Sequence, residues 1–286
     1  MQAIHIAQAA TKTLWRNKSL WLFGFFIAAV GGTSSTGTHG GGGGSGGHAG
    51  GLFSGHEALP SWMWPLLAVG LVVAVGLLLM HVVSEGALID GVRRSRAGEE
   101  VRIRIGFRAG LAHFWVLLGI KALLAVVLLF VVAAMAAPAV LAALDFVPML
   151  TALVSIPLVI AGAPVLLTVY LLSTYALRIA VLDDEGIVES FRAARAFLSG
   201  RLLDSLRLLV VTLLGQFGAG LLMVVVVLPA AVVGVVLYFV AGLVPAAIVA
   251  GVLALPFVAV LVGAMGTFQS TVWTIGFLEG RKAEIA

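Results

Sequence analysis

Long stretches without charge, separated by short charged segments, dominate the chain. Each of six apolar runs is long enough, or nearly long enough, to cross a membrane as a helix, which takes about 20 residues. The runs cover residues 19–32, 62–83, 114–144, 147–181, 206–240 and 243–278. The alternating pattern of a membrane β-barrel is missing. The chain is therefore predicted to be an all-α, polytopic transmembrane helix bundle with about six spans, forming one transmembrane domain over residues 1–286.

Composition agrees with this prediction. Hydrophobic residues make up 61% of the 286 residues and charged residues 10%, whereas a soluble domain carries about 25% charged residues. There is no cysteine, which excludes disulfides, thiol nucleophiles and cysteine-based metal sites.

The number of spans follows from the charges that flank the runs. No charged residue lies between Arg207 and Glu279, and this length fits either two long spans or three shorter ones. Basic residues stand before it and after it, and the positive-inside rule places both flanks on one side of the membrane. Two spans satisfy this rule. The same reasoning gives two spans between Arg108 and Arg178, whereas the short first run crosses only if its flanking residues extend the helix.

Orientation follows from the same charges. Of the 17 Lys and Arg residues, only Lys121, Arg178 and Arg207 fall inside predicted spans, and the last two lie close to span ends. The loops 33–61, about 145–147 and about 241–245 hold no Lys or Arg. We therefore expect both termini to be cytoplasmic and the glycine-rich loop 33–61 to be flexible and extracytoplasmic.

The glycine-rich loop allows three interpretations. A phosphate-binding loop needs glycines joined to a helix N-terminus, usually with a lysine, and this loop contains no lysine. A metal site is suggested by His39, His48, His56 and Glu57, but a glycine coil does not preorganise them. A flexible tether is the prediction, with no metal and no cofactor.

Three short segments with helical periodicity precede pairs of spans. In residues 186–199 one face carries Ile187, Phe191, Ala194 and Leu198, and in residues 4–15 a similar face carries Ile4, Ala7, Thr11 and Trp15. Residues 101–112 are less clear, because VRIRIGF alternates as a strand would. These segments predict cytoplasmic amphipathic helices, each leading a two-span hairpin. The result is three parallel pseudo-repeats, over about 1–90, 91–182 and 183–286.

Two stretches resemble a known group of proteins. They are TLWRNKSLWLFGFFIAAVGG at 13–32, followed by the glycine-rich loop, and YALRIAVLDDEGIVESFRAARAFLSGRLLDSLRLL at 175–209. Both resemble bacterial six-span proteins that are similar to the membrane domain accompanying glycerophosphoryl diester phosphodiesterases. The resemblance implies a bacterial plasma-membrane protein linked to lipid or envelope biology. It carries over no enzymatic activity, because the phosphodiesterase chemistry belongs to a separate soluble domain.

Polar residues inside the predicted spans are candidate functional residues, because burying them in a membrane is costly. Lys121 is interpreted as an ion or anion site, as the partner of an acid, or as a lysine that reaches the cytoplasmic interface. His81 and Glu85 lie four residues apart on one helix face and form either a proton-sensitive pair or a structural hydrogen bond. Gln216 and Gln269 are interpreted either as lining a polar pathway or as forming hydrogen bonds between helices.

Small residues also stand out in the last two apolar runs. Gly215, Gly218, Gly220, Gly263 and Gly266 are expected to allow close contact between helices or bends.

Basic residues on the cytoplasmic side suggest contact with anionic lipid headgroups rather than with nucleic acid. The candidates are Arg93, Arg94, Arg96, Arg108, Arg192, Arg195 and Arg201. No Ser-His-Asp set, HExxH motif or pair of intramembrane carboxylates occurs, so we expect no enzymatic activity.

The sequence favours a non-catalytic membrane protein that organises lipid or a membrane partner complex. The alternative is a transporter or channel component for a lipid or a small apolar solute. If Lys121, Gln216 and Gln269 line one cavity, transport is favoured, and if they lie at separate helix contacts, an organising role is favoured.

Overall fold

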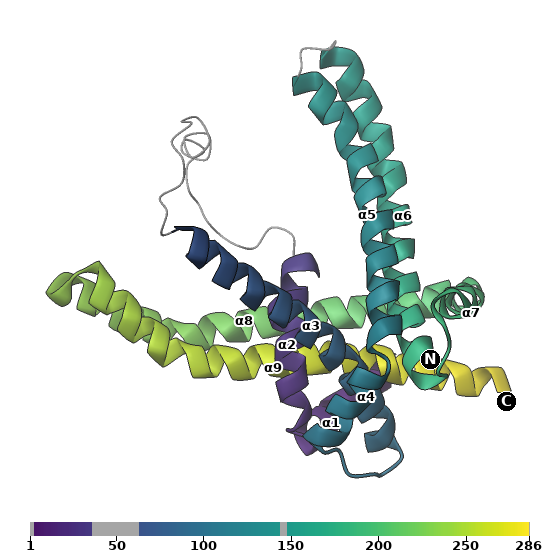
Figure 1. The fold of residues 1–286 in the computed structure, drawn as a ribbon, viewed down its shortest axis with the longest axis horizontal. Helices are drawn as coiled ribbons and strands as arrows, with labels where there is room; N and C mark the ends of the chain where they lie inside the picture. Colours follow the sequence, from purple (N-terminus) through teal and green to yellow (C-terminus); the bar gives the residue numbers. More distant parts are fainter. Residues whose placement is uncertain (1–2, 36–62, 144–147, 286) are drawn as a thin grey trace.

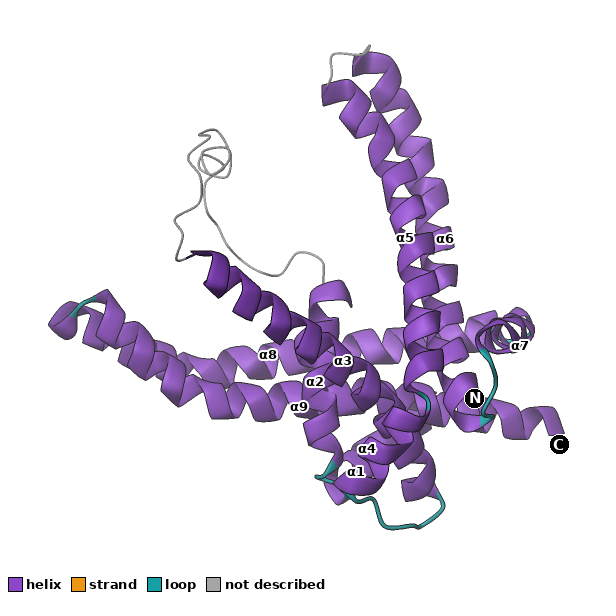
Figure 2. Ribbon diagram, viewed as in Figure 1, coloured by secondary structure: helices purple, strands orange, loops and turns teal. Residues whose placement is uncertain are grey.

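A computed structural model describes residues 3–35, 63–143 and 148–285, and this part of the chain is helical with no strand (Figures 1 and 2). The helices are α1 (Ala3–Arg16), α2 (Leu20–Ser35), α3 (Met63–Arg96), α4 (Ile103–Ala112), α5 (Phe114–Ala143), α6 (Pro148–Leu182), α7 (Ile187–Ser199), α8 (Leu202–Ala241) and α9 (Leu243–Ile285). Apart from 33–35, the glycine-rich loop and its histidines lie outside the described residues.

Five helices are long and apolar enough to cross a membrane, namely α3, α5, α6, α8 and α9. The prediction of an all-α membrane protein is confirmed. The α2 helix has 16 residues, about 24 Å at 1.5 Å per residue. The six spans and the pseudo-repeats stay predictions, although a short helix precedes two further helices three times along the chain.

Helices α2–α3, α5–α6 and α8–α9 pack as pairs and diverge from a common base (Figure 1). Within this base α3, α6 and α9 contact one another pairwise. Buried aromatic side chains fill the contact, with the rings of Tyr175 and Trp273 5.8 Å apart and those of Phe197 and Phe277 5.0 Å apart. The core of the described part therefore lies at the base.

The α3 helix continues beyond the predicted end of its apolar run, from Val83 to Arg96. This continuation is buried from Gly86 to Val92 because other helices of the base cover it. The strand-like VRIRIGF segment is also helical from Ile103 onward. There α4 packs through Gly106 and Gly110, which bring its backbone close to Ala87 and Val83 of α3.

A seam of small residues holds α2 against α9. A Cβ atom on Gly263 would lie 2.6 Å from the Trp21 carbonyl oxygen, and Gly266 similarly approaches the Gly24 backbone. Thr267 Oγ1 lies 3.0 Å from the Leu20 carbonyl oxygen. The close contact expected at Gly263 and Gly266 is thus confirmed.

The three remaining glycines of interest lie on α8. Gly215 packs against the Phe268 ring of α9. A Cβ atom added at Gly218 or Gly220 would meet nothing within 4 Å in the described part of the chain. Close contact is therefore absent at these two glycines in the described part of the chain, and a bend, the other expected role, stays a prediction.

The short helices expose different faces. In α7 the predicted apolar face packs into the core, with Ala194 and Leu198 buried. In α1 the predicted face is wrong, because Ile6, Ala10 and Leu14 are buried while Ile4 and Trp15 are exposed. Two apolar stripes run along α1, and the inner one packs on α9.

Candidate polar site at the base

Three charged or titratable side chains meet where α3 and α5 leave the base. Lys121 of α5 lies with its Nζ 2.5 Å from Glu85 Oε2 and 3.0 Å from His81 Nε2, both on α3. Lys121 has only donors, so His81 Nε2 accepts, and Nδ1 then carries the proton toward the Phe26 carbonyl oxygen at 3.3 Å. The cluster thus ties α2, α3 and α5 together.

A second cation lies behind this cluster. Arg178 of α6 is only 4% exposed. Its Nη1 donates to the Thr174 carbonyl oxygen, and its Nε has no hydrogen-bond partner within residues 3–35, 63–143 and 148–285. No carboxylate lies within ion-pair distance of Arg178 in the described ranges, although Glu85 interacts with it electrostatically. The site therefore places two cations, Lys121 and Arg178, around one carboxylate.

Hydroxyl side chains recur in the second half of three long helices. They belong to Ser84 of α3, Ser173 and Thr174 of α6, and Ser270 and Thr271 of α9. Ser84, Thr174, Ser270 and Thr271 are buried. Thr271 Oγ1 donates to the Thr267 carbonyl oxygen, whereas the hydroxyls of Ser84 and Ser270 have no partner among the described residues. Buried hydroxyl groups are thus part of the core of the base.

Sequence reasoning expected a polar patch of Thr168, Tyr170, Ser173 and Thr174 late in the fourth span but missed Ser84, Ser270 and Arg178. In the sequence Arg178 stands out only as the edge of an apolar run and as a neighbour of the acidic turn 183–185. The repeated Ser-Glu or Ser-Thr pair near the end of three apolar runs is the signal that would have located the two missed serines.

Gln216 and Gln269 do not join the cluster. Both are half-buried, and no hydrogen bond links either to Lys121 among the described residues. Gln216 lies on α8, which packs mainly on α9 and also contacts α1 and α7. The five candidate residues therefore divide into a compact group of three and two separate glutamines.

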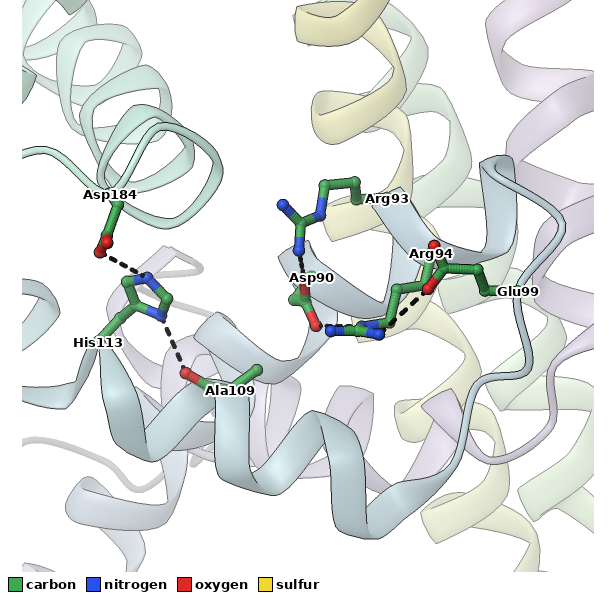
Figure 3. Close-up of polar contacts among 7 residues, drawn as sticks. All are labelled: Asp90, Arg93, Arg94, Glu99, Ala109, His113 and Asp184. Carbon is green, nitrogen blue, oxygen red and sulfur yellow. Dashed lines mark hydrogen bonds and ion pairs between the residues drawn. The ribbon is translucent and has the colours of Figure 1, made fainter.

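The candidate arginines also divide into two groups. Figure 3 shows Asp90 between Arg93 and Arg94, with Arg94 Nη1 also 3.1 Å from Glu99 Oε2. Arg96 pairs with Glu279 at 2.8 Å. Arg201 donates to the Gly280 carbonyl oxygen and lies over the Phe197 ring. These four arginines are engaged within the protein.

The other three, Arg108, Arg192 and Arg195, are exposed and form no ion pair in the described part of the chain. They remain available to a negatively charged surface.

Further ion pairs join the helix ends at the base. Arg281 of α9 contacts Asp183 through two bonds of 2.5 and 2.6 Å. His113 lies with Nε2 3.2 Å from Asp184 and Nδ1 3.0 Å from the Ala109 carbonyl oxygen (Figure 3). The turn after α6 is thereby connected to α9 and to the start of α5.

Away from the base, the long helices present apolar surface. Phe130 of α5 is 71% exposed and Phe239 of α8 is 81% exposed. An open hollow of about 610 Å³ runs along α8 and is lined by apolar side chains that include Met223, Val227 and Ala231. The apolar lining of this hollow suits hydrocarbon chains.

Comparison with known proteins identifies a family. The chain matches, over residues 2–277, the family of unknown function DUF7544, and it belongs to that family. Neither the curated proteins nor the solved structures gave a match.

Proposed function

We propose that this member of the DUF7544 family is a non-catalytic integral membrane protein that organises lipid or a membrane partner complex around its base. One observation carries the proposal, namely that paired apolar helices diverge from the base and leave their side chains uncovered. Lipid or another membrane protein has to cover such surfaces, because apolar side chains avoid water.

Charge supports contact with lipid headgroups. Arg108 on α4, together with Arg192 and Arg195 on α7, is exposed on the helices of the base. Anionic lipids attract such residues by about 1 kcal/mol each near a membrane surface. On α4, Ile103, Phe107 and Leu111 are also exposed one turn apart, which is the pattern of a helix lying in the headgroup region.

The proposed location is the bacterial plasma membrane, with both termini and the base on the cytoplasmic side. The basic residues of the base support this orientation through the positive-inside rule. We also propose a relationship to the six-span proteins that resemble the membrane domain of glycerophosphoryl diester phosphodiesterases. It rests on residues 13–32 and 175–209.

The test is purification in lipid nanodiscs followed by mass spectrometry of every lipid and protein that stays bound. We expect enrichment of anionic lipid over its bulk fraction, and loss of that enrichment in Arg192→Gln/Arg195→Gln. Arg102→Gln is the matched control, because Arg102 is 71% exposed and already pairs with Glu100. Retention of lipid in bulk proportion, with no protein partner, would refute the organising role.

A transporter or channel component for a lipid or a small apolar solute is the second candidate. The Lys121–Glu85–His81 cluster favours it, because charged groups inside membrane helices often mark a transport pathway. Flux of a fluorescent lipid across proteoliposomes tests it. Transport that disappears in Lys121→Met would support this candidate over the first.

A further inference from the structure

The polar site at the base carries more positive than negative charge. Glu85 pairs with Lys121 at 2.5 Å, and no ion pair joins Glu85 to Arg178 among the described residues. A buried charge is costly unless another charge or several hydrogen bonds compensate it. Arg178 has one carbonyl acceptor and an unpartnered Nε. An anion is the complement that this arrangement lacks.

Two other side chains of the base offer donors to such an anion. Within the described part of the chain, Trp273 Nε1 has no acceptor and the Ser84 hydroxyl has no partner. Trp273 packs edge-on against Tyr175, which lies one turn before Arg178, and Ser84 precedes Glu85 on α3. An indole N–H only donates, and a hydroxyl also donates. The complement is thus an anion with several acceptor oxygens, as a phosphate group has.

Access to the site comes from the apolar side. Lys121 is 26% exposed and Glu85 16% exposed. From this cluster α3 and α5 diverge toward their far ends (Figure 1). Leu78 lies one turn from His81, and Leu128 lies two turns after Lys121 on the same face of α5; both are exposed. A ligand at Lys121 therefore has charge on one side and apolar surface on the other.

We propose that the junction of α3, α5 and α6 binds a phosphate group, with Lys121 as the contact at its exposed edge and Arg178 as the buried charge behind it. The adjoining apolar faces of α3 and α5 make a phospholipid the favoured source, with its acyl chains along those faces. This choice of source rests on the proposed lipid function, whereas the phosphate chemistry rests on the charges of the site.

The experiment measures thermal unfolding of the full chain in detergent. The chain has no cysteine for thiol dyes but has six tryptophans, so tryptophan fluorescence reports unfolding. The added probes are dioleoyl phosphatidylglycerol, dioleoylglycerol with the same chains but no phosphate, and inorganic phosphate. A ligand that binds only the folded state raises the unfolding midpoint.

We expect phosphatidylglycerol to raise the midpoint of the wild-type protein and dioleoylglycerol to leave it nearly unchanged. Arg178→Met should lose at least half of that rise. This variant should still fold, because it removes a buried charge that has no close partner. Lys121→Met/Glu85→Gln keeps the local charge balance and should lose the rise as well. Arg102→Met, in the exposed segment before α4, should keep all of it.

Other outcomes have definite meanings. A similar rise with inorganic phosphate alone supports the phosphate site and assigns free phosphate as the source. Equal rises with both lipids, or an undiminished rise in Arg178→Met and in the double variant, overturn the site. If the site fails while Arg192→Gln/Arg195→Gln still loses bound anionic lipid, the proposed organising function stands without it.

Discussion

Replacing Gly263 with alanine tests how α2 is held against α9. The new Cβ would lie 2.6 Å from the Trp21 carbonyl oxygen, and real Cβ contacts essentially never fall under 3.0 Å. The obstacle is backbone and cannot rotate away. The two helices must therefore separate by at least the difference between these distances, about 0.4 Å.

That movement has a calculable cost. The contact between Thr267 Oγ1 and the Leu20 oxygen, now 3.0 Å, would lengthen to about 3.4 Å and weaken. Overpacking costs about 1–3 kcal/mol, and a hydrogen bond between membrane helices is worth about 0.6 kcal/mol. Because alanine has a higher helix propensity than glycine, the substitution also adds about 0.5–1 kcal/mol to the free energy of unfolding. The net loss of unfolding free energy is about 1–3 kcal/mol.

The control is Gly251→Ala on the same helix, where a Cβ meets nothing within 4 Å among the described residues. The free energy of unfolding of this variant should rise by about 0.5–1 kcal/mol, so the two variants should differ by about 1.5–4 kcal/mol. Equilibrium unfolding in mixed micelles, followed by tryptophan fluorescence, measures the difference. If Gly263→Ala is as stable as Gly251→Ala, the close seam between α2 and α9 is refuted.

Three further predictions concern the base. Lys121→Met should lower the free energy of unfolding by about 3 kcal/mol, because it leaves Glu85 unpaired, and adding Glu85→Gln should restore most of that loss. Additive losses in a double-mutant cycle would argue against the ion pair. The coupling energy between Arg281→Gln and Asp183→Asn should be only about 0.5–1 kcal/mol, since Arg281 is 45% exposed. A double-mutant cycle of unfolding free energies measures it, and zero coupling would mean that the contact is absent. Ser199→Cys introduces the chain's one thiol at the exposed end of α7, and an impermeant maleimide should label it only after permeabilisation; labelling of intact cells would contradict a cytoplasmic base.

The positions of the long helices could be predicted from the sequence, because they follow from the positions and lengths of the uncharged apolar runs. The apolar runs beginning at Phe114 and Leu243 start at the same residues as α5 and α9. The last turns of α3 were missed, because their polar residues, such as Ser84 and Asp90, look like those of a surface segment. Contacts from other helices bury them, and a linear pattern does not record those contacts.

The candidate site was predictable only in part. The spacing of His81 and Glu85 placed them on one helix face, but Lys121 joins them from another helix, and that meeting depends on how the helices pack. Arg178 illustrates the same limit, because the nearest acidic residues in the sequence, 183–185, form no ion pair with it among the described residues, and its neighbours in space are mostly apolar. The inner face of α1 was missed because Ile6, Ala10 and Leu14 form a second apolar stripe beside the predicted one.

The lengths of α8 and α9 relate the shape of the protein to the thickness of the bilayer. With 40 and 43 residues, they extend about 60 Å or more, twice the roughly 30 Å of a hydrocarbon core. An overlong apolar helix is accommodated by tilting, bending or local thickening of the bilayer, and the divergence of the helix pairs in Figure 1 provides that tilt. Ion pairs join the base ends of α3, α5 and α9, so we expect the far ends of the helix pairs to spread and the angle between them to widen in a thinner membrane.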